Sequence, residues 1–345
     1  MIPWLVAAVS TVLAGLPAAN GQHADPEFRW LSPSTWSVNR KALLRDLQAA
    51  ADQGYRLVPL PNAGSLLLVR KSADPLEPVE YVFASGGKDM NAKAAIGYRL
   101  LNNGVMVRTK GLTARTHEYA EVATRRRESM EHELQVAAKQ GFRVVELGLR
   151  LIVGARSFAV SNTEFVAELE RPVQPTDLTH PEYLVLSTLK AATMQTELQA
   201  AADRGYRLLP LESGWGATAL LEKIGEPELV EYLVLSAAKI ATMQVEMDKA
   251  SAEGYRFAGT LGSGSREFAV VMQRAKGAHT RTHEQRLLAT ARLDTLKRES
   301  LPELEKGFVV VGLPTAPGLS SNDAIVAIME RPVKSEFSKY DPLRF

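Results

Sequence analysis

The sequence predicts an α+β fold made of six tandem strand–helix–strand–strand units, arranged as two lobes of three units each. One observation is a near-copy, because A-A-D-Q-G-Y-R-L at 50–57 recurs as A-A-D-R-G-Y-R-L at 201–208. A second is that a short apolar run precedes each copy of a Gly-aromatic pair. That pair occurs at six places along the chain: Gly54-Tyr55, Gly97-Tyr98, Gly141-Phe142, Gly205-Tyr206, Gly254-Tyr255 and Gly307-Phe308.

Each unit is expected to begin with a strand. In the fourth unit Tyr183 and Val185 alternate with Leu184 and Leu186, which is the period of two that a strand requires. The six openings are P-E-F-R-W-L-S from 26, V-E-Y-V-F-A from 79, T-H-E-Y from 116, P-E-Y-L-V-L-S from 181, V-E-Y-L-V-L-S from 230 and T-H-E-Q from 282.

A helix is expected to follow the first strand. Met194, Leu198 and Ala201 recur at helical spacing in a run of good helix formers. Gly205 stands where this helix must stop, and glycine adopts the left-handed conformation of such a cap without a Cβ clash. The repeated octet is therefore the end of a helix, its cap and the start of a second strand at Tyr206.

A third strand completes the unit after a glycine-flanked turn, as A-T-A-L-L-E from 217 does in the fourth unit. The helix of the second unit is expected to be short, because Tyr81 and Tyr98 lie closer in sequence than Tyr183 and Tyr206. Pro302 is expected to start or kink the helix of the sixth unit, because proline lacks the backbone N–H of a helix interior.

A higher order relates the two halves of the chain. Both end on E-R-P, at 170–172 and at 330–332, and the spacing of the aromatic residues in the first half is echoed in the second. We therefore expect a first lobe over 26–172, a linker over 173–180, a second lobe over 181–332 and a tail over 333–345.

The units resemble a small bacterial domain whose pattern runs E-Y-K-V-V, then L-x-x-x-L-N-x-x-G-x-x-G-W-E-L-V, then a strand that ends in Lys or Arg. The matching residues of the fourth unit are Glu182-Tyr183 with Val185, Met194 with Leu198, and 205–208, with Tyr-Arg in place of Trp-Glu. The fifth unit matches through Glu231-Tyr232 and 254–256. The resemblance implies a βαββ fold and carries no known activity.

The N-terminal segment predicts export from the cytoplasm. Residues 2–19 contain no charged side chain, and Pro17 with the small residues after it is typical of a signal-peptidase site. We expect residues 1–21 to be a signal peptide, which leaves no membrane span after its removal, with an uncleaved membrane anchor as the alternative. The absence of cysteine excludes disulfides and thiolate sites, and a net charge of +2 disfavours nucleic acid as a partner.

Two histidines are the candidate acid–base residues. His117 and His283 stand at equivalent places in the two lobes, each preceded by Thr and followed by Glu. No second histidine follows at metal-ligand spacing, so we expect no metal site and no cofactor. The alternative interpretation is that both are polar strand starts inherited by duplication.

Three further residues are candidates for partner binding: Trp215, Arg207 and Arg256. Trp215 lies between two glycines at an expected hairpin tip, where an aromatic side chain suits contact with a protein or a glycan. Arg207 and Arg256 follow the Gly-aromatic pair and are expected on the sheet face opposite the aromatic side chain. Pairing between such arginines and the glutamates of the first strands is the alternative to a ligand-binding face.

These patterns leave several functional classes open. The leading hypothesis is an exported, non-enzymatic scaffold that binds a protein or polysaccharide partner, because repetition enlarges a surface whereas catalysis needs one preorganised constellation. The alternatives are an envelope or extracellular hydrolase that uses His117 or His283, and a small-ligand module between the lobes near Trp215. A histidine within hydrogen-bond reach of a buried carboxylate in a cleft would favour the hydrolase.

Overall fold

A computed structural model confirms the expected α+β fold of six βαββ units. It describes residues 28–31, 40–58, 67–71, 77–102, 104–151, 163–174, 180–188, 190–209, 218–226, 228–261, 268–316 and 324–333. Trp215 and the expected signal peptide lie outside these residues. None of the described helices is long and apolar enough to span a membrane.

The six units follow one another along the chain. The first holds β1 (Phe28–Leu31), α1 (Arg40–Asp52), β2 (Tyr55–Val58) and β3 (Leu67–Lys71), and the second holds β4 (Val79–Phe83), α2 (Gly86–Ala94), β5 (Arg99–Asn102) and β6 (Val105–Thr109). The third holds β7 (His117–Thr124), α3 (Arg127–Lys139), β8 (Arg143–Leu151) and β9 (Thr163–Pro172), and the fourth holds β10 (Glu182–Ser187), α4 (Ala191–Ala202), β11 (Arg207–Leu208) and β12 (Thr218–Lys223). The fifth holds β13 (Val230–Ala237), α5 (Ile240–Ala252), β14 (Arg256–Leu261) and β15 (Phe268–Ala275). The sixth holds β16 (His283–Thr290), α6 (Leu293–Glu305), β17 (Val309–Gly312), a short β18 (Thr315–Ala316) and β19 (Ala324–Pro332).

Within each unit the third strand is central and pairs antiparallel with both others. In the fifth unit Tyr232 of β13 and Arg256 of β14 both lie opposite Gln273 of β15. The first and second strands are therefore the two edges of every sheet and are not neighbours. Their unpaired backbone groups must find other partners when they are buried.

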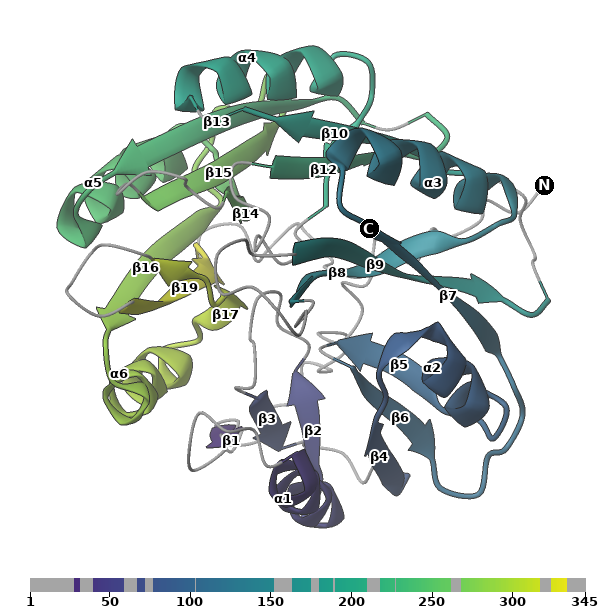
Figure 1. The fold of residues 1–345 in the computed structure, drawn as a ribbon. Helices are drawn as coiled ribbons and strands as arrows, with labels where there is room; N and C mark the ends of the chain where they lie inside the picture. The colour runs from purple at the N-terminus through teal and green to yellow at the C-terminus, as the bar shows by residue number, and fades with distance from the viewer. Residues whose placement is uncertain are drawn as a thin grey trace, which may run out of the picture.

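The units close into a ring (Figure 1). The helix of each unit packs against the first strand of the next, from α1 on β4 through α5 on β16, and α6 packs on β1. The last of these contacts includes a hydrogen bond of 2.9 Å from Trp30 Nε1 to Ser300 Oγ. In Figure 1, β8, β14 and β17 face the middle of the ring, whereas α4, α5 and α6 lie on its outside.

The hydrophobic cores lie between units. The cluster around α4 combines Met194 and Leu198 with Tyr232 of β13 and Val271 of β15, all nearly inaccessible to solvent. Five similar clusters join the other neighbouring units, including the sixth and the first. A single βαββ unit buries little apolar surface alone, so each helix is covered by its own sheet on one side and by the next sheet on the other.

The repeated glycines cap the helices as expected. All six have φ between +84° and +93°. At the end of α4, Gly205 N–H bonds to Ala202 O at 2.9 Å and Tyr206 N–H to Ala201 O at 3.1 Å, which are the paired bonds of a Schellman cap. The aromatic residue that follows is buried in four units, as Tyr55, Tyr98, Phe142 and Phe308, and partly buried in the fourth and fifth, as Tyr206 and Tyr255.

Two expected departures have different outcomes. The helix α2 has 9 residues, fewer than the 13 of α1, so the expected shortening is confirmed. Pro302 does not start a helix, because α6 begins at Leu293 and continues through it to Glu305. The exposed side of α6 accommodates the proline ring, and Lys306 N–H still bonds to Pro302 O at 3.3 Å.

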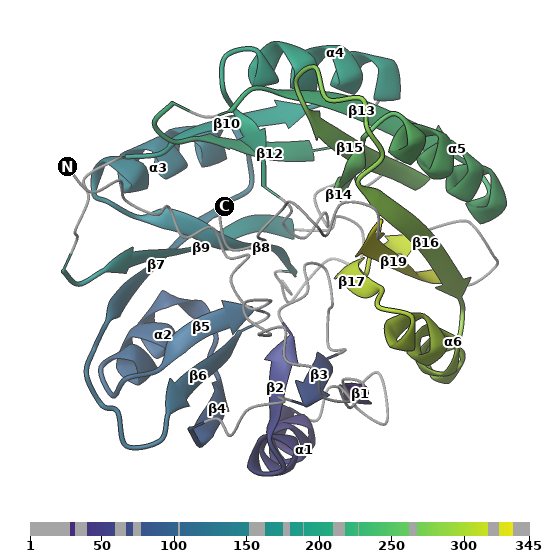
Figure 2. The same ribbon diagram turned by 180° about the vertical axis from the view of Figure 1, so that it is seen from behind.

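The division into two lobes stays a prediction. Helix α3 packs on β10 across the expected boundary in the same way as the other helices pack on their neighbours. The first and last units also contact each other, so the arrangement is a continuous ring (Figure 2).

Candidate functional site

Polar side chains of the helices bond to the edge of the neighbouring first strand that has no strand partner. On α4, Gln195 donates to Tyr232 O at 2.7 Å and accepts from Val234 N–H at 2.6 Å, while Gln199 accepts from Tyr232 N–H at 3.1 Å. Equivalent bonds come from Gln48, Asn91, Glu131, Gln135 and Gln244. These side chains satisfy the backbone groups of a buried edge strand and fix its register against the helix.

The closing interface is different. Lys297 and Leu301 of α6 occupy the positions that Gln195 and Gln199 occupy on α4. At this interface the hydrogen bond from Trp30 to Ser300 joins the helix to β1 instead. A lysine and a leucine at these two positions cannot form the paired amide bonds that Gln195 and Gln199 form at α4.

A tyrosine of the first strand reaches back into the preceding unit. Its hydroxyl oxygen accepts the backbone N–H of the third residue after the cap glycine, in the neighbouring second strand, at 2.7 to 3.2 Å. The pairs are Tyr81 with Leu57, Tyr119 with Leu100, Tyr183 with Val144, and Tyr232 with Leu208. Burial raises the pKa of each of these hydroxyls above 10, so they remain neutral at any ordinary pH.

Buried carboxylates form a second kind of link between units. Glu222 of β12 accepts a bidentate bond from Arg143 of β8, at 3.0 and 2.7 Å, and a bond of 3.0 Å from the Tyr183 hydroxyl. The Glu222 side chain is only 7% exposed. The buried charge is therefore paired with the neighbouring unit, as a carboxylate at such a depth requires.

His117 lies beside such a carboxylate. Arg99 of the second unit pairs with Glu170 of β9 at 3.0 Å, and the Tyr119 hydroxyl donates to Glu170 at 3.5 Å. Burial lowers the pKa of His117, opposed by the charge of Glu170 and reinforced by that of Arg99. Its Nδ1 lies 2.9 Å from Thr116 Oγ1.

His283 lies within reach of a buried carboxylate. Its Nε2 is 3.4 Å from Glu330 Oε1, and its Nδ1 is 2.8 Å from Thr282 Oγ1. Arg256 of the fifth unit also approaches Glu330, at 3.6 Å, and Phe257 N–H donates to it at 3.3 Å. Both ring nitrogens of His283 thus have partners inside the fold.

The structure does not bring the two histidines together. His117 begins β7 and His283 begins β16, which lie on opposite sides of the ring in both views (Figures 1 and 2). Each belongs to its own interface between two units. An acid–base mechanism would use one of them, not both.

Gln285 takes the place of the tyrosine in the sixth unit. It is 3% exposed, and neither polar atom of its side-chain amide has a hydrogen-bond partner among the residues that the structure describes. The Phe257 N–H, which a tyrosine hydroxyl would accept elsewhere, bonds to Glu330 instead. The shorter glutamine side chain explains why the carboxylate takes over this role.

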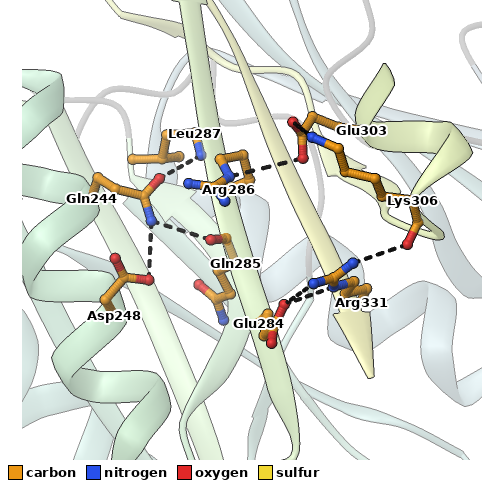
Figure 3. A network of polar contacts seen from close by, with 9 residues as sticks. All are labelled: Gln244, Asp248, Glu284, Gln285, Arg286, Leu287, Glu303, Lys306 and Arg331. Carbon is orange, nitrogen blue, oxygen red and sulfur yellow. Dashed lines mark hydrogen bonds and ion pairs between the residues drawn. The ribbon is translucent and has the colours of Figure 1, made fainter. Parts of the chain in front are cut away.

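In the second, third, fifth and sixth units a glutamate of the first strand pairs with an arginine of the third strand, as Figure 3 shows for the sixth. Glu284 of β16 accepts from Arg331 of β19 at 2.6 Å; the same guanidinium donates to Lys306 O at 3.1 Å and lies 4.6 Å from the centre of the Phe308 ring. The same arrangement occurs around Arg108, Arg171 and Arg274. These clamps join the helix end, the capped aromatic residue and two strands of one sheet.

The arginines after the Gly-aromatic pairs have other partners than expected. First and second strands are not adjacent, so Arg207 and Arg256 cannot face the first-strand glutamates of their own units. Arg207 donates to the Glu228 carbonyl, and Arg256 approaches Glu330 of the next unit. Trp215 lies outside the described residues, so its role as a contact residue stays a prediction.

The clamps predict that acid destabilises the fold. Hydrogen bonds from Arg108 and Arg171 lower the pKa of Glu80 and Glu118 below the ordinary 4.5, against the opposing effect of burial. A depressed folded pKa contributes stability above pH 4.5 that is lost as the pH falls through the folded value. Melting temperatures measured from pH 7 to pH 2.5 should fall below pH 4.5.

The matched comparison for this prediction is the double variant Arg108→Gln with Arg171→Gln. Without the two guanidinium partners the carboxylate pKa values return toward the ordinary value, so the loss of melting temperature below pH 4.5 should be smaller. An identical acid dependence in the variant and the unmodified protein would show that these pairs do not cause it.

A described pocket of about 410 Å³ lies between α2 and β7. It is lined by Ser85, Gly86, Gly87, Lys88, Asn91, Tyr119, Ala120 and Glu121. Of this lining, the Asn91 side chain is already engaged by the protein, because it bonds to the backbone of Tyr119. No group of three or more His, Asp or Glu side chains suited to a metal ion occurs among the described residues.

We did not predict from the sequence that polar side chains of the helices bond to the sheet of the next unit. The signal was present, because a polar residue directly follows the buried Met90, Met130, Met194 and Met243. Its meaning depends on the position of the next unit, which the local pattern does not show.

The fold and its interfaces together define a class of protein. It is a closed α+β ring of six units, in which recurring polar side chains join neighbouring units. Comparison with protein-family models, with curated proteins and with solved structures found no match. The likeness to the small bacterial βαββ domain therefore stays a proposal, and the architecture alone defines the class.

Proposed function

We propose that this protein is an exported, non-enzymatic ring scaffold that binds a protein or polymer partner. The observation that supports this proposal is the use of the recurring polar residues. The tyrosine hydroxyls, helix amides and third-strand carboxylates each bond to a neighbouring unit. A closed ring built in this way is a rigid support that presents equivalent positions of six units to a partner.

The direct test is capture of a partner from envelope extracts by the mature protein. Trp215→Ala should lose the partner, because an aromatic side chain at a hairpin tip is a typical anchor. Ile96→Ala is the matched control, since it removes an apolar side chain that is 50% exposed elsewhere on the ring. Equal capture by both variants would contradict the role of Trp215, and no capture by the unmodified protein would contradict the scaffold.

One observation favours a second candidate, an envelope or extracellular hydrolase. The His283 imidazole lies 3.4 Å from the buried Glu330 carboxylate, which is a geometry that general acid–base catalysis can use. Against it, Arg256 and the Phe257 N–H already engage that carboxylate. The hydrolase would need a histidine for turnover, whereas the scaffold would not use the histidines to bind its partner.

Substitution of both histidines distinguishes the two candidates. If the protein is a scaffold, the double variant His117→Ala with His283→Ala should bind the partner with an affinity within about 2-fold of that of the unmodified protein. The reason is that surface binding does not use the two interface histidines. The measurement is partner affinity together with turnover of envelope polymers and the melting temperature. Turnover by the unmodified protein that the double variant loses at unchanged melting temperature would establish the hydrolase instead.

Export makes a separate prediction. The mature chain should begin near Gln22, because the peptidase recognises small residues after an apolar segment. Mass spectrometry of the protein recovered from the envelope and medium fractions gives the N-terminus directly. An intact Met1 would establish the membrane anchor in place of the cleaved signal peptide.

A further inference from the structure

The closing interface, where α6 packs on β1, differs from the other five interfaces in its side chains. At each of the other five, a side-chain oxygen of the helix accepts a backbone N–H of the first strand of the next unit. These acceptors, at 2.6 to 3.1 Å, are Gln48, Asn91, Glu131, Gln195, Gln199 and Gln244. The corresponding positions of α6 hold Lys297 and Leu301, and neither side chain has an acceptor atom.

The link made by a tyrosine hydroxyl is also impossible at the closing interface. Four first strands carry a tyrosine that accepts a backbone N–H of the preceding unit, whereas β1 carries Phe28 at this position. The interface is held instead by the hydrogen bond of 2.9 Å from Trp30 to Ser300 and by apolar packing of Phe28 and Trp30 against a cluster that includes Leu296. Two kinds of polar link that recur around the ring therefore cannot form where the ring closes.

The closing interface is also the place where the chain does not connect the two units. Each of the other interfaces joins units that are consecutive in the sequence, so a linking segment keeps them close when their contacts break. Trp30 and Ser300 are 270 residues apart. Bringing such distant residues together costs more conformational entropy than joining consecutive units, and separating them stretches no linker.

We propose that the closing interface is a gate, at which the ring opens between α6 and β1 while the other five interfaces stay closed. Proteins open first where the fewest contacts oppose the motion, at a lower free energy than that of global unfolding. Opening uncovers the apolar surface that Phe28 and Trp30 share with Leu296, which the closed ring covers. A partner that binds this surface shifts the protein towards the open form.

Thiol labelling measures the opening, because the sequence contains no cysteine and a single introduced thiol is the only one that reacts. Ser300→Cys places the thiol at the closing interface, and Ser251→Cys places it on the buried side of α5. Both serines are 0% exposed, so both thiols react with iodoacetamide only after an opening. We expect Ser300→Cys to be labelled at least about 10-fold faster in native buffer.

A second comparison uses variants that all carry Ser300→Cys, because this substitution itself alters the bond from Trp30. Lys297→Gln with Leu301→Gln restores the two helix amides and should slow labelling by about 10-fold, the combined effect of two hydrogen bonds on the opening equilibrium. The control pair is Val245→Gln with Lys249→Gln on α5, which also replaces one basic and one apolar residue four positions apart. The control pair should change the labelling rate by less than about 2-fold.

The urea dependence of labelling distinguishes the gate from global unfolding. Opening one interface exposes less surface than unfolding, so labelling of Ser300→Cys should rise less steeply with urea than the fraction of unfolded protein does. A dependence as steep as that of global unfolding, or equal labelling rates of the two thiols, would overturn the proposal. Equal effects of the amide pair and the control pair would overturn it as well, because the missing acceptors would then not decide where the ring opens.

Discussion

Leu198→Ala is expected to lower the free energy of unfolding by about 2–5 kcal/mol, the range for removing a fully buried leucine side chain. Leu198 is 0% exposed and packs in the cluster that joins α4 to the sheet of the fifth unit. The cavity left behind has a helix on one side and two sheets around it, which limits how far the site can collapse. Urea unfolding measures the effect.

The control is Val245→Ala on α5, whose side chain is 52% exposed and should change the free energy of unfolding by no more than about 0.5 kcal/mol. Hydrogen exchange shows whether the core cluster around Leu198 is shared by two units or belongs to one unit. Leu198→Ala should reduce protection in both the fourth and fifth units, because Tyr232 and Val271 belong to the same cluster. Loss of protection confined to the fourth unit would contradict the arrangement of cores between units.

Gly205→Val is expected to destabilise the protein by about 1–3 kcal/mol, because a β-branched residue is strained in the left-handed conformation. Gly205 has φ of +90° and holds the paired bonds that end α4. Arg204→Ala is the neighbouring control; it removes an exposed side chain that lies 5.3 Å from the centre of the Tyr206 ring and should have a small effect.

Gly205→Asn adds a test of the mechanism. Asparagine adopts the left-handed conformation more readily than valine, so its melting temperature should lie between those of the unmodified protein and Gly205→Val. Equal small effects of valine and asparagine would show that the backbone conformation at Gly205 contributes little to stability.

Local pattern was enough to predict much of each unit. Gly205 and Tyr206 indicated a cap and a strand start from their neighbours alone, and the structure has both. The short α2 followed from the spacing of Tyr81 and Tyr98. Such features depend on residues a few positions apart, which is the range over which capping and periodicity act.

Less of the candidate site could be predicted from the sequence. His283 was identified by its place in the repeat, but its partner Glu330 was not, because the two come together only through the pairing of β16 with β19. Arg143 and Glu222 lie in different units, and no local spacing connects them. The partner of each second-strand arginine follows from the strand order, in which the third strand separates the first from the second.

By itself the sequence determined the six units, their βαββ order and the glycines that end their helices, since these rest on backbone preferences and short-range periodicity. Only the tertiary structure decided that the units close into a ring and that Gln195 bonds to the edge of the next sheet. It also decided that Trp30 contacts Ser300 from the opposite end of the chain. The physical reason is that a unit this small cannot cover its own helix, and which surface covers it depends on the packing of the whole chain.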